Sequence, residues 1–197
     1  MASSLKVKKL RLVAVDIIAS RREKAKAVFN ALTSLSLDFV EFKTASPEEA
    51  IVQVSTWTNT FGCNAVLEVE QNIYFVLMYF PTNQNKPQIV GNNPALALSY
   101  TLIRPFGVIV SVGVHQAPQV PFTGRQLYNK NVAFEFGRCP VRALFPLAVD
   151  VLSRHQSVFG SVGKPESLVD RVVGIEEASE AYRLFDKGEV GKVILVP

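Results

Sequence analysis

A short apolar run that ends in one acid, followed at once by a helix start, is the feature that most constrains this chain's fold. Residues 10–16 (Leu-Arg-Leu-Val-Ala-Val-Asp) are largely aliphatic before the acid, as expected of a strand buried on both faces. Ser20 and Glu23 have the spacing of a capping box, which predicts a helix from Ser20 to about Ala31.

The same alternation of strand and helix continues along the chain. We predict further strands at 37–42, 64–69, 108–112, 132–136 and 191–196, a turn at 104–107, and helices at 46–57, 94–102, 141–155 and 175–187. The helix at 46–57 has the strongest start, because Ser46 can cap it, Pro47 suits its first turn, and two glutamates follow. This order indicates an α/β fold with a parallel sheet.

Residues 70–89 interrupt that rhythm. They contain only two charged residues, and they match neither a helix face nor a polar loop. We expect a single domain over 1–197 with an atypical insertion at 70–89.

Composition limits the classes of protein to consider. The longest apolar run, 73–80, is too short to span a membrane, and the N-terminus lacks the apolar region of a signal peptide. Two cysteines, Cys63 and Cys139, indicate neither a disulfide framework nor a closed zinc site, so we expect a reduced, cytoplasmic setting.

The net charge is +4, and the basic excess lies early in the chain, at Lys6, Lys8, Lys9, Arg11, Arg21, Arg22, Lys24 and Lys26. A basic patch can bind nucleic acid, and such binding would depend steeply on salt. No pattern of stacking aromatic residues accompanies these side chains, so we expect a solvated basic face and no nucleic-acid partner.

Eight short stretches, taken together in their order and spacing, resemble the cofactor-binding half of the zinc-dependent medium-chain alcohol dehydrogenases. They are Val-Ala-Val-Asp at 13–16, Ala-Val-Leu-Glu-Val at 65–69, Leu-Ile-Arg-Pro-Phe-Gly-Val at 102–108, Ser-Val-Gly-Val-His at 111–115, Phe-Thr-Gly at 122–124, Tyr-Asn-Lys-Asn-Val at 128–132, Phe-Gly-Arg-Cys-Pro-Val-Arg at 136–142 and Ala-Tyr-Arg-Leu-Phe-Asp-Lys-Gly at 181–188. The resemblance implies a Rossmann-type doubly wound parallel sheet, here incomplete because its first strand and helix are missing. It also implies that the complete enzyme transfers hydride between an alcohol or aldehyde and NAD.

By the same resemblance, eight residues would contact the cofactor. Asp16 would hydrogen-bond the adenosine ribose hydroxyls, and Arg21 would pack on that ribose. The nicotinamide carboxamide would meet backbone groups of Val112 and Val114, beside Gly113. The remaining candidates are Phe134 and Phe136 at the next strand end and Lys192 on the pyrophosphate. The basic side chains of Arg21 and Arg22 suit the 2′-phosphate of NADP, but a carboxylate at Asp16 repels it, which favours NAD.

Two departures from the family pattern argue against activity of this chain by itself. The chain has no glycine before Gly62, so the glycine-rich turn that cradles the pyrophosphate is absent from this sequence. The GroES-like domain that supplies the family's zinc ligands is also absent, and His115 and His155 are the chain's only histidines. We therefore assign no catalytic residue and no metal ligand, although zinc belongs to the complete family enzyme.

A third departure is the insertion itself. Without residues 70–89, Val69 would join Val90 in a stretch that looks like the uninterrupted family pattern, so we hypothesise retained non-coding sequence or a splice variant. The missing first strand leaves a gap in the strand order 3-2-1-4-5-6. Either its two neighbours pair directly, or another segment fills the gap, and 73–80 is apolar and β-prone enough for that role.

Two functional hypotheses remain open. The chain is either the cofactor-binding portion of an alcohol dehydrogenase-like oxidoreductase, inactive alone, or a degenerate Rossmann module for nucleotide binding or subunit association. The resemblance also implies a homodimer through the cofactor domain, by strands near Val108–Phe136.

Overall fold

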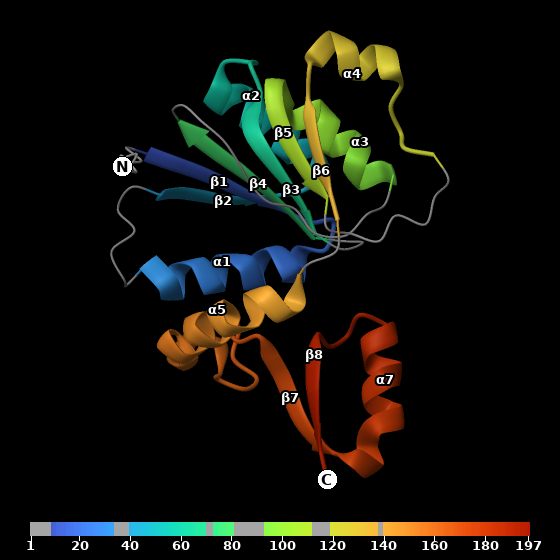
Figure 1. Ribbon diagram of the computed structural model, residues 1–197. Helices are drawn as coiled ribbons and strands as arrows, with labels where there is room; N and C mark the ends of the chain where they lie inside the picture. The colour runs from blue at the N-terminus through green and yellow to red at the C-terminus, as the bar shows by residue number, and fades with distance from the viewer. Residues whose placement is uncertain (1–8, 34–39, 70–72, 81–92, 112–118, 138–139) are drawn as a thin grey trace. The chain divides into compact units, whose positions relative to one another are not determined.

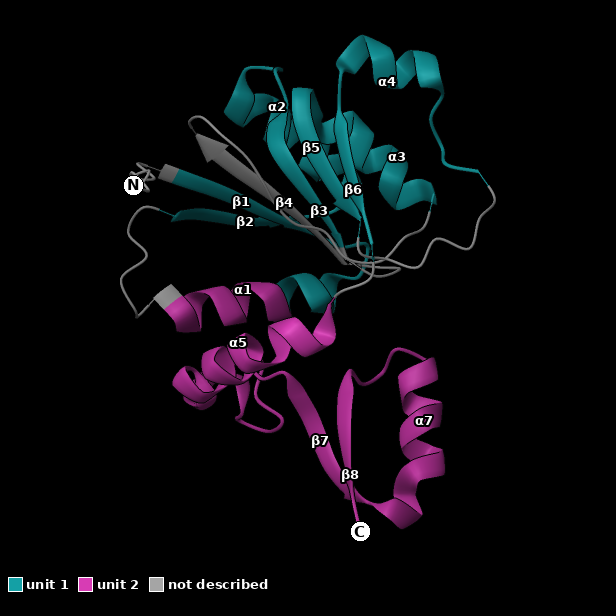
Figure 2. Cartoon of the chain, viewed as in Figure 1, with its two compact units in different colours: residues 1–23, 37–139 teal, residues 24–36, 140–197 magenta. Residues whose placement is uncertain are grey.

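The computed structural model describes residues 9–33, 40–69, 73–80, 93–111, 119–137 and 140–197, and for 73–80 it describes the backbone alone (Figure 1). The chain divides into two compact units, residues 1–23 with 37–139 and residues 24–36 with 140–197 (Figure 2). The single domain expected over 1–197 stays a prediction.

The first unit contains a six-stranded sheet in the order β2-β1-β4-β3-β5-β6 (Figure 1). Its strands are β1 (Lys9–Val15), β2 (Val40–Ala45), β3 (Cys63–Val69), β4 (Ile73–Phe80), β5 (Ile103–Ser111) and β6 (Ala133–Phe136). Its helices are α2 (Pro47–Thr58), α3 (Asn93–Leu102) and α4 (Gly124–Lys130), while α1 (Ala19–Thr33) begins in this unit and continues in the second. The predicted α/β class with a Rossmann-type sheet is confirmed.

β4 lies at the centre of this sheet, between β1 and β3. It pairs with β1 from Lys9↔Phe80 to Val15↔Tyr74, and with β3 from Ala65↔Leu77 to Val69↔Ile73. Both pairings are antiparallel, whereas every other strand pair in the sheet is parallel. The sequence left two alternatives open for the two strands on either side: they pair directly, or another segment lies between them. The structure has the second, because residues 73–80 of the insertion lie between β1 and β3.

The core of the first unit lies between the sheet and the helices α2 and α3. Val13 and Val15 of β1 and Ile109 of β5 are fully buried there. Ala50 and Val54 of α2 pack into the same cluster. These strands carry aliphatic residues at successive positions, as strands covered on both faces do.

The predicted helix at 46–57 is confirmed, and its start is built as expected. Ser46 Oγ accepts the Glu49 N–H at 3.3 Å, and Glu49 Oε2 accepts the Ser46 N–H at 2.7 Å, which completes a capping box. Pro47 occupies the first helical turn, where a missing N–H costs nothing. This start matters for the site, because it fixes two glutamates beside the end of β2.

The predicted turn at 104–107 is a bulge inside β5. Cys63 pairs with Ile103 and Ala65 with Val108, so a two-residue step on β3 faces a five-residue step on β5. Phe106 adopts a positive φ of 58° there. A Cβ on Gly107 would lie 2.4 Å from the Ile103 side chain, so this position requires glycine.

The second unit contains a two-stranded parallel sheet and its helices. Its elements are α5 (Val141–Arg154), α6 (Gln156–Phe159), β7 (Val169–Gly174), the 3-10 turn η1 (Ile175–Glu177), α7 (Ala178–Asp186) and β8 (Lys192–Val196). Within this unit, Asp170 of β7 accepts hydrogen bonds from Lys24 Nζ of α1 and from the Gly191 N–H, which lies just before β8. The sequence predicted α5, α7 and β8 but not β7, and it also missed α4 in the first unit.

Candidate functional site

The parallel strands β1 and β2 end side by side, and Asp16 is the first residue after β1. Its N–H donates to the Ala45 carbonyl at 3.1 Å, which continues the β1–β2 pairing by one residue. Its side chain is almost fully buried, with 3% of the residue exposed. The sequence predicted this acid at a strand tip, and the structure places it there.

The two carboxylate oxygens of Asp16 differ in their surroundings. Oδ1 accepts the Ile18 N–H at 2.7 Å, at the entrance to α1. Oδ2 is buried and has no hydrogen-bond partner among the described residues. A buried acceptor without a donor costs free energy, so Oδ2 is a position where a ligand hydroxyl would be stabilised.

Arg21 and Arg22 are the basic residues nearest to this carboxylate. Arg21 Nη1 lies 4.0 Å from Oδ2, an ion-pair distance that is too long for a hydrogen bond. Arg22 Nη1 donates to the Asp16 carbonyl at 2.6 Å. Burial raises the pKa of Asp16, and the Ile18 N–H and the two arginines oppose that rise without cancelling it.

The predicted cap of α1 is wrong. α1 begins at Ala19, so Ser20 lies inside the helix and not before it. The physical reason is that the Asp16 carboxylate accepts the Ile18 N–H just before the helix. Asp16 therefore takes the place that the sequence had assigned to Ser20 as the side-chain acceptor at the helix start. The acid at the strand tip therefore also organises the helix start.

A second buried carboxyl group lies further along the same edge of the sheet. Glu68 of β3 and Ser111 of β5 are both fully buried, and Ser111 Oγ donates to Glu68 Oε2 at 3.0 Å. Glu68 is paired with Tyr74 of β4 in the strand register. This hydrogen bond joins β3 to β5 near the ends of both strands.

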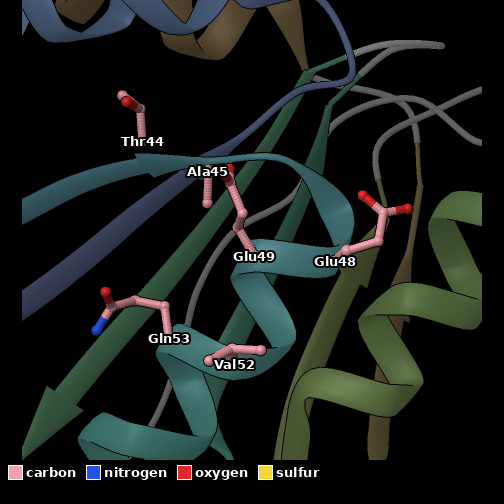
Figure 3. A pocket seen from close by; sticks show the side chains of 6 residues that line it. All are labelled: Thr44, Ala45, Glu48, Glu49, Val52 and Gln53. Atoms are coloured by element: carbon pink, nitrogen blue, oxygen red, sulfur yellow. The ribbon is translucent and has the colours of Figure 1, made fainter.

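A shallow, open hollow of about 530 Å³ lies where β2 passes into α2. Six residues line it, as Figure 3 shows: Thr44, Ala45, Glu48, Glu49, Val52 and Gln53. The hollow adjoins Asp16, because the Ala45 carbonyl accepts the Asp16 N–H. Sequence reasoning identified Glu48 and Glu49 only as a helix start, although the same pattern places two carboxylates beside a strand end.

The other residues that the sequence predicted to bind the cofactor do not all lie beside Asp16. Phe134 and Phe136 lie together on β6 with ring centroids 5.6 Å apart, and Phe134 also packs on Phe122 at 4.8 Å. Lys192 begins β8 in the second unit. Val112, Gly113 and Val114 lie outside the described residues, so their predicted contacts with nicotinamide stay predictions.

Nothing in the described part of the chain has the ligand set of a metal centre. No group of three or more histidine, cysteine, aspartate or glutamate side chains gathers among these residues. Cys63 is buried and donates to the Leu102 carbonyl, and burial raises the pKa of its thiol to about 12. Such a thiol is protonated at neutral pH. In the same described residues, no helix is long and apolar enough to cross a membrane.

The residues present fit one end of a nicotinamide dinucleotide better than the other. The buried Oδ2 of Asp16 suits a ribose hydroxyl of the adenosine end. The pyrophosphate end normally lies at a glycine-rich turn between the central strand and a helix. Here the central strand is β4, which begins at this edge and runs away from it, so that arrangement is not formed.

No family model matches the chain, but individual proteins do. The chain is 34% identical, over 194 residues, to the zinc-type alcohol dehydrogenase B of Aspergillus flavus, and the match covers 98% of this chain and 37% of that protein. Among solved structures, an alcohol dehydrogenase from Thermus sp. ATN1 is 27% identical with a TM-score of 0.63, over 92% of this chain and 42% of that one. A short chain alcohol dehydrogenase from E. coli CFT073, complexed with NADH, shares the fold at 18% identity and a TM-score of 0.56, over 94% and 44%.

The chain is similar, over almost its whole length, to a partial, C-terminal portion of zinc-type alcohol dehydrogenases. It spans about two-fifths of the length of these proteins. The resemblance stated from the sequence motifs is thereby confirmed. What a whole enzyme of the family does is a separate question for this chain.

Proposed function

We propose that this chain is the cofactor-binding portion of an alcohol dehydrogenase-like oxidoreductase, and that it binds NAD by the adenosine end. In the complete enzyme, the bound NAD would exchange a hydride with an alcohol or aldehyde. The chain itself would not turn over, because its described residues offer no metal ligand set.

The observation that carries this proposal is the buried Oδ2 of Asp16. This carboxylate oxygen receives no hydrogen bond, so it can accept one from a ligand hydroxyl. A ribose supplies two hydroxyl groups that can donate such a bond. Asp16 stands directly after a strand of a Rossmann-type sheet, at the carboxyl edge where such sheets bind nucleotides. The nearby Arg21 supports this placement, since its guanidinium lies within ion-pair distance of the carboxylate.

The remaining predicted contacts belong to the same proposal. Val112, Gly113 and Val114 would hold the nicotinamide carboxamide, Phe134 and Phe136 would flank it, and Lys192 would meet the pyrophosphate. The family resemblance supports these six assignments, whereas Asp16 and Arg21 are also supported by their geometry.

The test is a calorimetric titration of the full chain with NADH, repeated with the variant Asp16→Asn. Asparagine keeps the size of the side chain and an oxygen for the Ile18 N–H, but it places an amide donor where the second acceptor was. Loss of a hydrogen bond to a charged group should weaken NADH binding about tenfold or more. Lys26→Ala, an exposed basic residue of α1, is the matched control and should leave the affinity unchanged.

Two results would refute the proposal. One is the absence of NADH binding by a chain whose circular dichroism shows a folded α/β protein. The other is an Asp16→Asn variant that binds NADH as tightly as the unsubstituted chain. Turnover of an alcohol with added NAD and zinc would separately contradict the expected inactivity.

Subunit association is the second candidate function, and one observation favours it. β6 is the last strand in the order of the described sheet, and Phe136 on it is 51% exposed. An edge strand with an exposed aromatic residue can pair with a second copy of the same chain. Sedimentation of the full chain as a dimer, abolished by Phe136→Lys, would support this association, whereas a monomer at all concentrations would exclude it.

A further inference from the structure

The second unit carries an amphipathic helix in which every residue is exposed. This helix is α5, from Val141 to Arg154. On a helical projection its large apolar side chains fall on one side. This side, the α5 face, consists of Val141, Leu144, Phe145, Leu147, Val151 and Leu152. The opposite side carries the charged and polar side chains, which are Arg142, Asp150, Ser153 and Arg154.

α5 needs a surface to pack against. It has 14 residues, and a helix of about this length is only marginally stable in water by itself. Pro146 lies inside it and lacks the N–H that would bond to the Arg142 carbonyl, which weakens the helix further. Amphipathic helices in proteins are stabilised mainly by burial of their apolar side. The exposed α5 face therefore requires a partner.

The two-stranded sheet of the same unit is covered on one side. α7 packs on the side of Val173 and Val193, which line one small cavity together with residues of α7. Side chains alternate along a strand, so the other side, the β7–β8 face, carries Val172, Ile194 and Val196, all of which are exposed. Parallel sheets normally have both faces covered, and a two-stranded sheet is marginal by itself. The β7–β8 face therefore requires a partner too.

We propose that the α5 face and the β7–β8 face cover each other between two copies of this chain, in a symmetric dimer. Within one copy they do not cover each other, because the side chains of both faces are exposed. In the dimer, α5 of each copy packs on the β7–β8 face of the other, so one two-fold axis buries both faces in both copies. This association uses the second unit alone and goes beyond the binding of NAD.

The size of the two faces supports a second copy as the occupant. The six side chains of the α5 face and the three of the β7–β8 face belong to residues that are 37–64% exposed. Together they present on the order of 800 Å², which is the area that each partner buries in a standard protein–protein interface. Monomeric proteins rarely expose apolar patches of this size. Two-fold dimers of identical chains are also the commonest protein assemblies.

The experiment is analytical ultracentrifugation of the full chain from about 1 to 100 μM, where we expect a dimer. Leu147→Lys and Ile194→Glu each place a charge in one face, so each should raise the dimer dissociation constant about tenfold or more. Both residues are exposed in the single copy, so the variants should keep the circular dichroism of the unsubstituted chain. Ser153→Lys adds the same charge as Leu147→Lys on the opposite side of α5 and is the matched control, which should dimerise normally.

A mixture of the two variants tests the exchange itself. The Leu147→Lys chain keeps an intact β7–β8 face, and the Ile194→Glu chain keeps an intact α5 face. A mixed dimer therefore retains one fully apolar contact, and an equimolar mixture should dimerise more tightly than either variant alone. A mixture that dimerises no better than its components would overturn the inference.

Three other results would also overturn it. A dimer that is lost in Leu147→Lys but kept in Ile194→Glu would show α5 packing on α5 of the second copy. A dimer that is lost only in Phe136→Lys would show pairing through β6 and would support the second candidate function. A monomer at all concentrations would leave both faces to a different partner, such as the portion of an alcohol dehydrogenase that this chain does not span.

Discussion

Deletion of residues 70–89, which joins Val69 to Val90, tests whether β4 holds the sheet together. β4 makes seven register pairs with β1 and five with β3. An antiparallel ladder has on average about one hydrogen bond per residue pair, and each contributes a net ~0.5–1.5 kcal/mol. The deleted ladder is thus of order 6–18 kcal/mol, which equals the whole free energy of unfolding of an ordinary domain, ~5–15 kcal/mol.

Direct pairing of β1 with β3 would recover part of this loss, but the helices that cover the sheet would then have to shift. We therefore expect the deletion variant to lose its cooperative unfolding transition in urea, measured by circular dichroism. A point variant gives a finer test. Val76 faces Val13 on one side and Val66 on the other, so Val76→Pro removes a donor from a central strand and should cost about 3 kcal/mol or more.

Val76→Ala is the matched control, because it shortens the side chain but keeps the N–H. The reasoning is wrong if the deletion variant unfolds at the same urea concentration as the full chain. It is also wrong if the proline and alanine variants are equally stable. In that case the insertion lies outside the sheet, and the hypothesis of retained non-coding sequence would gain support.

Three further predictions concern single side chains. Because burial raises the pKa of Asp16, its ionised form opposes folding at neutral pH. Asp16→Asn should therefore stabilise the chain at pH 7, and this gain should vanish below about pH 4, where both states are protonated; a loss of stability at pH 7 would contradict this. Burial raises the pKa of Asp170, but the hydrogen bonds from Lys24 and the Gly191 N–H, together with the charges of Lys24 and Arg171, outweigh burial and lower that pKa. The stability that Asp170 contributes is therefore present above about pH 4 and is lost as the pH falls further. Asp170→Asn should remove this acid dependence from thermal unfolding, and the exposed Asp186→Asn should not. With its pKa of about 12 and no exposure, Cys63 in a Cys139→Ser variant should react with a thiol reagent only on unfolding, and rapid labelling of the folded chain would refute its burial.

The sequence allowed the fold class and the site's central residue to be predicted, because both depend on local patterns. The aliphatic run of β1 and its terminal acid predicted a buried strand with Asp16 at the tip, and the structure agrees. The cap at Ser46 predicted the start of α2, since a capping box requires only neighbouring residues.

Other features depend on contacts between residues far apart in the sequence, so local sequence patterns could not predict them. The antiparallel pairing of β4 with both β1 and β3 is set by which strand edges remain open, not by the composition of residues 73–80. The helix start after Asp16 was misplaced for a related reason, because the carboxylate competes with Ser20 as the cap. β7 was missed since half of its residues are polar or glycine, and it is held by Asp170 and by pairing with β8.

The hollow beside Asp16 could have been suspected from the sequence. Glu48 and Glu49 follow the strand next to β1, and parallel strands end at the same edge of a sheet. The sequence alone did not show that the Ser46 and Glu49 N–H groups are both donated within the α2 capping box.

The most direct test of the central claim is a titration of the ¹⁵N-labelled chain with adenosine, followed by amide chemical shifts. The account predicts saturable shifts at Asp16 and Ile18, whose N–H groups are hydrogen-bonded to Ala45 and to the Asp16 carboxylate, and none at Asp170 in the second unit. Shifts confined to residues away from Asp16, or no shifts with a well-dispersed spectrum, would contradict it.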